Sequence, residues 1–194
     1  MKQKQRCGWC VGKPLYEQYH DDEWGVPVWN DQKQFEFLVL ESAQAGLSWW
    51  TILQRRENYR AAFAGFDPGK VARFNAKQIE KLLKNEGIIR NRAKIESAVS
   101  NAKAFLDIQD KHGSFCSYFW DFTDGKPINN RLQSLKDARA NTLLSDTITK
   151  DMKQKGFKFL GSTVMYAHMQ ATGMVNDHLV SCFRHKEVQK LKHK

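Results

Sequence analysis

Residues 85–92 read N-E-G-I-I-R-N-R, and this short stretch decides how the fold is interpreted. Apolar residues recur at three- and four-residue steps on both sides of it: Ile79, Leu82, Leu83, Ile95, Ala98, Val99 and Ala102. This spacing is typical of two helices that each bury one face. Gly87 permits a tight turn between them. The stretch therefore predicts two helices joined at a sharp corner.

The corner also has features that bind phosphate. The helix that follows presents free backbone N–H groups at its start, and Arg90, Arg92 and Lys94 add positive charge there. This is the layout of a helix-hairpin-helix element, although an ordinary solvated turn would have the same pattern. The chain has 31 Lys and Arg against 21 Asp and Glu, a net charge of +10. The corner and the charge together favour contact with a DNA backbone.

Helical patterns fill most of the 194 residues after an irregular first thirty. We expect one helix through Phe35, Leu38, Val39 and Ala43, and further helices that begin near Ser48, Asp67, Asn75, Asn91, Ser114, Ser145 and Ser162. Residues 123–141 are polar and lack periodicity, so we expect a surface connection there, and no segment alternates like a β-strand. The predicted fold class is therefore all-α. One unit over residues 1–185 and a disordered basic tail over 186–194 are expected.

The first residues, M-K-Q-K-Q-R, lead into Cys7 and Trp9 rather than into the apolar run of a signal peptide. No apolar run reaches the roughly 18 residues that a bilayer requires. We therefore expect a soluble cytoplasmic protein with no membrane partner. Four cysteines in that compartment are expected as metal ligands, reactive thiols or core residues.

Cys7 and Cys10 raise two alternatives, a redox pair and a metal site. A redox Cys-x-x-Cys needs a strand-to-helix junction, and no such pattern surrounds these residues. His178 and Cys182 are four residues apart and would share a face of a helix, and Cys7 with His20 would complete a Cys2His2 set. Four protein ligands would make a structural site. Taken alone, each histidine is more typical of a hydrogen-bonded core or surface position than of a metal ligand.

Aromatic residues gather in the first fifty positions, at Trp9, Tyr16, Tyr19, Trp24, Trp29, Trp49 and Trp50. They could form an aromatic core, which we favour for Trp29 and Trp50, or a box that stacks on a nucleobase. Glu41 lies close to the apolar stripe of its helix. A carboxylate there is costly unless it is paired or used, although it could also be a surface residue at the edge of the stripe.

Several long motifs, taken together, resemble the DNA-3-methyladenine glycosylase I family. They are R-C-G-W at 6–9, P-L-Y-E-Q-Y-H-D-D-E-W-G-V-P at 14–27, L-E-S-A-Q-A-G-L-S-W at 40–49, R-E-N-Y-R-A-A-F at 56–63, G-I-I-R-N-R at 87–92, K-G-F-K-F-L-G-S-T at 155–163 and V-N-D-H-L-V-S-C at 175–182. The resemblance extends from Arg6 to Cys182. It implies an all-helical fold of the helix-hairpin-helix superfamily with one structural zinc ion.

The resemblance also implies roles for individual residues. The family's zinc ligands correspond to Cys7, His20, His178 and Cys182, its base-binding glutamate to Glu41, and its pocket aromatics to Trp9, Tyr16, Tyr19, Trp24 and Trp49. Its DNA contacts correspond to Gly87, Ile88, Ile89 and Arg90, and the segment that enters the duplex to Gly46 and Leu47. Cys10 has no implied role. Many members of the superfamily have a catalytic aspartate after the hairpin, but none can be matched here, and Asp107 is the only nearby candidate.

The implied activity is excision of 3-methyladenine from alkylated duplex DNA. A monomeric N-glycosyl hydrolase would flip the damaged nucleotide, release free 3-methyladenine and leave an abasic site, without lyase activity because no lysine is placed as a nucleophile. Two other interpretations stay open: a DNA-binding module held together by zinc but without chemistry, and a thiol oxidoreductase that uses Cys7 and Cys10. The aromatic cluster around Glu41 argues against the first of these.

Overall fold

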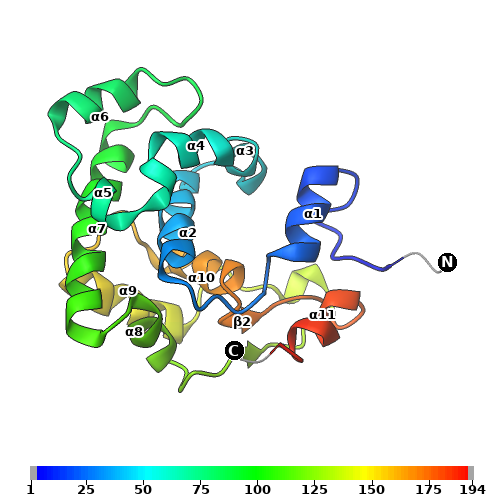
Figure 1. Ribbon diagram of the computed structural model, residues 1–194. Helices are drawn as coiled ribbons and strands as arrows, with labels where there is room; N and C mark the ends of the chain where they lie inside the picture. Colours follow the sequence, from blue (N-terminus) through cyan, green and yellow to red (C-terminus); the bar gives the residue numbers. More distant parts are fainter. Residues whose placement is uncertain (1–3, 192–194) are drawn as a thin grey trace.

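The computed structural model describes residues 4–191, which are mostly helical (Figure 1). The elements in chain order are α1 (Pro14–Asp22), α2 (Asp31–Gln44), α3 (Trp49–Leu53), α4 (Arg56–Ala62), η1 (Ala64–Phe66), α5 (Pro68–Val71), α6 (Ala76–Leu83), α7 (Arg92–His112), α8 (Phe115–Asp121), β1 (Ile128–Asn129), η2 (Leu135–Asp137), α9 (Leu143–Gln154), α10 (Ser162–Ala171), β2 (Val175–Asn176) and α11 (Phe183–Val188). The sequence predicts an all-α fold; the described residues are mostly helical, as expected, but they also contain one short pair of strands.

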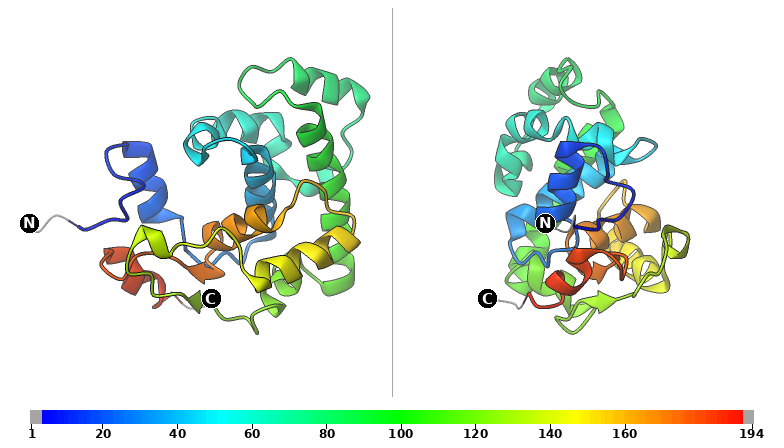
Figure 2. Two further views of the ribbon diagram at one scale, coloured as in Figure 1. Left: turned by 180° about the vertical axis from the view of Figure 1, so that it is seen from behind. Right: turned by 90° about the vertical axis from the view of Figure 1, so that its right-hand side faces the viewer.

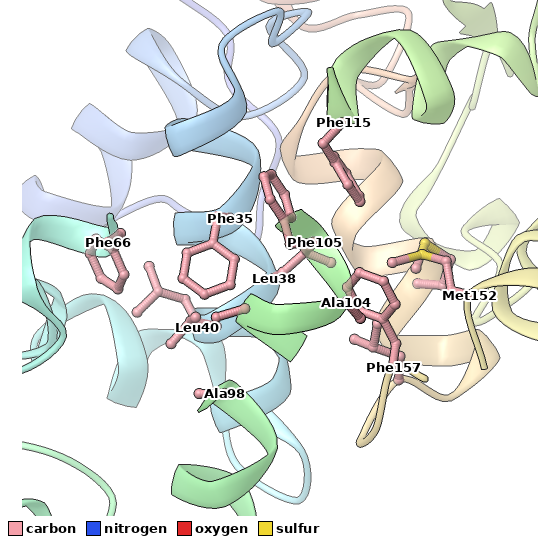
Figure 3. Packing of buried hydrophobic residues seen from close by; sticks show 14 of the residues in the cluster. Phe35, Leu38, Leu40, Phe66, Ala98, Ala104, Phe105, Phe115, Met152 and Phe157 are labelled. Atoms are coloured by element: carbon pink, nitrogen blue, oxygen red, sulfur yellow. The ribbon is translucent and has the colours of Figure 1, made fainter. Parts of the chain in front are cut away.

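Helix α2 runs through the middle of the molecule and is buried from Gln34 to Ala43. Its apolar side chains pack with those of α7 and α8. Figure 3 shows the rings of Phe35, Phe105 and Phe115, one from each of the three helices, close together. The Phe35 and Phe105 rings are 5.3 Å apart, and Phe105 stacks on Phe115 at 4.3 Å. Aromatic contacts of this kind add to the stabilisation that burial itself provides. The core therefore holds in place the helix that carries Glu41.

Side-chain caps explain why most of the helices begin where the sequence predicts. The side chains of Ser48, Asp67, Asn75, Asn91 and Ser114 each accept a hydrogen bond from a backbone N–H in the first turn. The start predicted near Ser162 is correct, since α10 begins at Ser162 after Gly161. The start predicted near Ser145 is two residues late, because α9 begins at Leu143 and is capped by Thr142. Helix α1 also forms within the first thirty residues, where no regular structure was expected.

The expected surface connection over residues 123–141 contributes to the structure. Its β1 strand pairs in parallel with β2, Ile128 with Val175 and Asn129 with Asn176. A two-residue strand is too short to show an alternating pattern, so the sequence could not predict it. The pair fastens this segment beside the C-terminal part of the chain.

The two ends of the described chain lie side by side, with α11 next to the base of α1 (Figures 1 and 2). The Phe183 N–H donates to the Gln5 carbonyl at 3.0 Å. The expected tail begins too early, because α11 extends to Val188, which is buried. Residues 192–194 of that tail lie outside the described residues. No helix between residues 4 and 191 is both long and apolar enough to cross a membrane.

Candidate functional site

A cluster of four buried side chains joins the two ends of the chain. Cys7, His20, His178 and Cys182 offer ligand atoms that all lie within 4.8 Å of one another. The Cys182 Sγ is 3.5 Å from His20 Nε2 and 3.7 Å from His178 Nδ1, and the Cys7 Sγ is 3.7 Å from the same Nδ1. The structure thus brings together all four residues that the sequence analysis selected.

The geometry within the C-terminal pair differs from the expected helix. His178 and Cys182 lie in a turn closed by the Cys182 N–H and the Leu179 carbonyl at 2.8 Å, and α11 begins only after Cys182. A turn of this size brings positions i and i+4 together as a helix would, so the two ligands still converge. The spacing correctly predicted that His178 and Cys182 are close together, but they are joined by a turn and not by the expected helix.

The outer ring nitrogens of both histidines have fixed partners. The His178 Nε2 lies 2.9 Å from the Trp24 carbonyl oxygen, which can only accept, so the proton is on Nε2 and the lone pair of Nδ1 faces the cluster. The His20 Nδ1 lies 2.8 Å from Asp21, which Arg6 holds with two further nitrogens. This second layer orients the rings as in protein metal sites. The cluster therefore fits a cation with four protein ligands.

The thiols do not form a redox pair. The Sγ of Cys10 donates to the Cys7 carbonyl at 3.1 Å, and burial raises the pKa of Cys10 to about 11. The Sγ of Cys7 instead faces the cluster, where it lies 3.7 Å from His178 Nδ1 and accepts a hydrogen bond from the Leu179 N–H at 3.4 Å. A nucleophilic thiol needs a lowered pKa and exposure, and Cys10 has neither.

A cavity of about 230 Å³ lies next to this cluster. It is lined by Trp9, Tyr16, Tyr19, Trp24, Glu41, Gln44, Trp49, Leu132, Leu135, Ala138, Ala167, Gln170 and Asp177. All five aromatic residues assigned to a base pocket are in this wall, together with Glu41. The side chains come from α1 and its flanks, α2, α3, residues 132–138, α10 and the residue after β2.

Glu41 is the most unusual polar group of the cavity. Its side chain is 3 % exposed, and its Oε2 atom has no hydrogen-bond partner among the described residues. Burial raises the pKa of Glu41 to about 8, so in the protein alone the carboxyl is mostly protonated at pH 7. A buried polar group without a hydrogen-bond partner costs stability. A carboxyl of this kind in a cavity therefore indicates a site that binds a ligand.

The aromatic rings of the cavity contact one another, edge-to-face around Trp9 and tilted between Tyr19 and Trp49. The Trp9 centroid is 4.8 Å from that of Tyr16 and 5.0 Å from that of Trp24, and Tyr19 lies 5.4 Å from Trp49. Trp24 also packs on the His178 ring at 4.7 Å. The candidate metal cluster therefore supports one wall of the cavity directly.

The two tryptophans expected in the core differ. Trp29 stacks on Trp120 at 4.3 Å and packs against the main core. Trp50 is only half-buried, at the surface between Tyr16 and the ammonium group of Lys13. The core prediction is thus correct for Trp29 and wrong for Trp50, which stands beside the cavity without lining it.

The predicted DNA contacts at 87–90 are partly used inside the protein. Ile88 is buried in the core, the Ile89 N–H donates to the Tyr59 hydroxyl at 3.0 Å, and the Gly87 N–H donates to Asn85 at 2.9 Å. The glycine packs so tightly that an added Cβ would lie 2.9 Å from the Asn58 side chain. Of residues 87–90, only Arg90 has an exposed side chain.

Asp107 is exposed on α7 and does not line the cavity.

A second corner, between α9 and α10, was missed by the sequence analysis. Residues 155–161 turn sharply at Gly156, and Gly161 precedes α10 with no side-chain cap, so the first N–H groups of α10 lack a side-chain acceptor. Lys158 is exposed there, and its backbone is held by Asn101 through bonds of 2.8 and 3.0 Å. The glycines and lysines of K-G-F-K-F-L-G were the available signal.

The segment expected to enter a duplex is presented at the surface. Gly46 ends the α2 region with a φ of +78°, and Leu47 is 41 % exposed beyond it. The Lys94 ammonium group donates to the carbonyl oxygens of Ala43 and Ala45 at 2.9 and 2.6 Å. This contact fixes the end of α2 to the start of α7. From the sequence, Lys94 was interpreted only as one of the positive charges at the corner.

Other cavity residues were also missed. Gln44 lies three residues after Glu41, and this helical spacing could have identified it. Leu132, Leu135 and Ala138 come from a segment whose sequence gave no signal.

Comparison with known proteins gives consistent matches over most of the chain. A family model described as methyladenine glycosylase matches residues 9–185. The sequence is 46 % identical over 178 residues to DNA-3-methyladenine glycosylase 1 of Escherichia coli (strain K12), covering 92 % of this chain and 95 % of that protein. The structure is similar to a crystal structure of 3-methyladenine DNA glycosylase I, with 48 % identity, a TM-score of 0.90 and coverage of 92 % and 98 % of the two chains. It is also similar to a structure concerning 3-methyladenine recognition by the Staphylococcus aureus 3-methyladenine DNA glycosylase I, with 36 % identity, a TM-score of 0.90 and coverage of 97 % and 98 %.

Proposed function

The chain belongs to the methyladenine glycosylase family, and we propose that it flips 3-methyladenine out of alkylated duplex DNA and hydrolyses its N-glycosidic bond. The observation that carries the assignment is the unpartnered Oε2 of Glu41 inside a cavity walled by aromatic rings. Aromatic faces stack on a base and attract cations, and a carboxylate accepts an exocyclic N–H. The cavity thus suits a flat, positively charged base.

Selection follows from charge. Methylation at N3 makes the base of the nucleotide cationic, so the C1′–N9 bond breaks with release of a neutral base and needs little further help. A cation beside Glu41 favours the ionised carboxylate, so the side chain would lose its proton as the damaged base enters. Normal adenine brings no charge, and binding it would leave Glu41 protonated and the aromatic faces without a cation.

A structural zinc ion is proposed at Cys7, His20, His178 and Cys182. In a tetrahedral site, bonds of about 2.3 Å to sulfur and about 2.0 Å to nitrogen place neighbouring ligand atoms roughly 3.5 Å apart, and the sulfur-to-nitrogen distances are 3.5 to 3.7 Å. Four protein ligands leave no position for water. The ion would therefore fasten the two ends of the chain and support Trp24, with no part in the chemistry.

DNA is proposed to lie across the face that presents Leu47. Leu47 would fill the space left by the flipped nucleotide, and the two helix corners, around Arg90 and around Lys158, would contact phosphates as elements of a helix-hairpin-helix fold. Because the N–H groups of Gly87 and Ile89 are engaged, we expect the larger contribution from the corner before α10. Lys158→Ala should then weaken DNA binding more than Arg90→Ala.

The enzyme is proposed to act as a monomer in the cytoplasm and to leave the abasic strand intact. The support for an intact strand is that no lysine of residues 4–191 lines the cavity, so no amine is placed to form a Schiff base. The support for a reducing compartment is that all four cysteines are free.

The test is an abasic-site assay on methylated and unmethylated duplex DNA. We expect alkali-labile sites in the methylated duplex only, and no nicks before alkali. A DNA-binding module without chemistry would bind both duplexes and produce no such sites. A thiol oxidoreductase would reduce insulin disulfides. We expect no such activity, because Cys10 is buried and its pKa is raised.

A further inference from the structure

Asp177 is a second acidic side chain in the cavity wall, and base recognition as described above gives it no role. It follows β2 directly and is 4 % exposed. Its position in the cavity wall could not be foreseen, because the cavity is lined by segments that are distant in the sequence.

Three neutral groups hold the Asp177 carboxylate. The Asn130 amide donates to Oδ1 at 2.6 Å, while the Tyr166 hydroxyl and the Gln170 amide both donate to Oδ2 at 2.8 Å. The Asn130 amide also lies 3.1 Å from the Tyr166 hydroxyl oxygen, so that hydroxyl accepts one hydrogen bond and donates its own proton to Asp177. Three donors suit an ionised carboxylate.

None of these donors carries a charge. Within residues 4–191 no Lys or Arg forms an ion pair with Asp177, and Arg131 and Arg139 line a neighbouring cavity with Asn130 and Tyr166. Burial and the negative charge of Asp177 raise the pKa of Tyr166. The arrangement satisfies the hydrogen bonds of the carboxylate without neutralising it. Glu41, in contrast, has no donor for Oε2.

We propose that Asp177 is a specificity-determining residue, whose carboxylate, held by neutral donors and without an ion pair, makes the cavity prefer positively charged ligands and the positively charged sugar formed during excision. This inference rests on the proposed function. When the C1′–N9 bond breaks, its electron pair leaves with the base, the positive charge passes to the sugar, and water adds at C1′ with loss of a proton. The Asp177 carboxylate, which three neutral donors hold in place, favours the charge at both stages, whereas Glu41 acts on the bound base alone.

The test compares two duplexes that differ only in charge. One contains a tetrahydrofuran abasic site, which is neutral, and the other a pyrrolidine abasic site, which is cationic at neutral pH. We expect the zinc-loaded wild-type protein to bind the pyrrolidine duplex more tightly, and Asp177→Asn to lower this preference about ten- to hundredfold. The affinity for the neutral duplex and the zinc content should change little. An unchanged preference in a folded, zinc-containing variant would overturn the proposal.

A second pair of variants leaves Asp177 and its neighbour His178 untouched. Gln170→Lys places an ammonium group where a neutral donor now contacts Asp177, and Gln170→Met removes the donor without adding charge. We expect Gln170→Lys to lose the preference for the cationic duplex and Gln170→Met to keep it. Equal preferences in these two variants would contradict the role of charge. Base release by the wild type is measured separately, so failure of the proposed function would be recognised independently.

Discussion

Replacing Glu41 by Gln is expected to stabilise the protein increasingly as the pH rises. The side chain is 3 % exposed, and burial raises its pKa from 4.5 to about 8. Between these values the folded protein binds a proton that the unfolded chain releases, so the stability of the wild type falls as the pH rises. Glutamine does not titrate, and its contribution stays constant.

The size of the effect follows from the two pKa values. One pH unit corresponds to about 1.4 kcal/mol when a single proton is taken up on folding. Proton uptake is incomplete near pH 5 and almost complete at pH 7, which gives a change of about 2 to 3 kcal/mol between these pH values. The change is the difference between variant and wild type, so ionisations common to both, including those of the metal ligands, cancel.

The assay is urea unfolding of both proteins from pH 5 to pH 8 with saturating zinc, extrapolated linearly to water. The matched control is Glu86→Gln, which changes a side chain that is 85 % exposed, and its difference from the wild type should vary by less than about 0.5 kcal/mol over the same range. A Glu41→Gln difference that is equally flat would show that the carboxyl is already ionised or already paired, and would refute the reasoning.

Three further predictions concern the base, the metal and the backbone. Glu41→Gln and Glu41→Ala should weaken binding of free 3-methyladenine by about tenfold or more while the fold is kept; an unchanged dissociation constant by calorimetry would remove Glu41 from the site. Cys182→Ala should lose zinc and thermal stability together, whereas Cys10→Ala, which changes a thiol bonded only to a carbonyl, should keep the metal; equal metal loss by elemental analysis would disprove the ligand assignment. Gly173→Ala should lower the free energy of unfolding by about 3 kcal/mol or more, because the added Cβ would lie 2.4 Å from the backbone at Val26 and Pro27. The control is Gly12→Ala, at a position that also has a positive φ but has nothing within 4 Å of the added Cβ, and it should cost about 1 kcal/mol. Similar losses in the two variants would contradict the predicted clash.

Features set by local chemistry were predictable from the sequence. Helix starts at Asn75 and Asn91 follow from side-chain caps that act within four residues. The cluster of Cys7, His20, His178 and Cys182 was predictable because the residue types and their spacing suggest a Cys2His2 set, and the family resemblance selects the same four.

Features that depend on tertiary packing were not predictable. The roles of Lys94 and Asp177 come from carbonyl oxygens and amides that are distant in the sequence. The corner at 85–92 showed the limit of pattern reasoning most clearly: its glycine and two helices are present, but the N–H groups of Gly87 and Ile89 are engaged by Asn85 and Tyr59. Whether a backbone donor is free can be read only from its neighbours in space.

The central claim is that this cavity accepts 3-methyladenine and that the enzyme cuts the bond to it. The most direct measurement is the mass of the base that the zinc-loaded wild type releases from methylated duplex DNA under single-turnover conditions. We expect 3-methyladenine in amounts equal to the abasic sites formed, and less of it from Glu41→Ala at the same enzyme concentration and time. Release of no base by the wild type, or release of unmodified adenine, would contradict the claim.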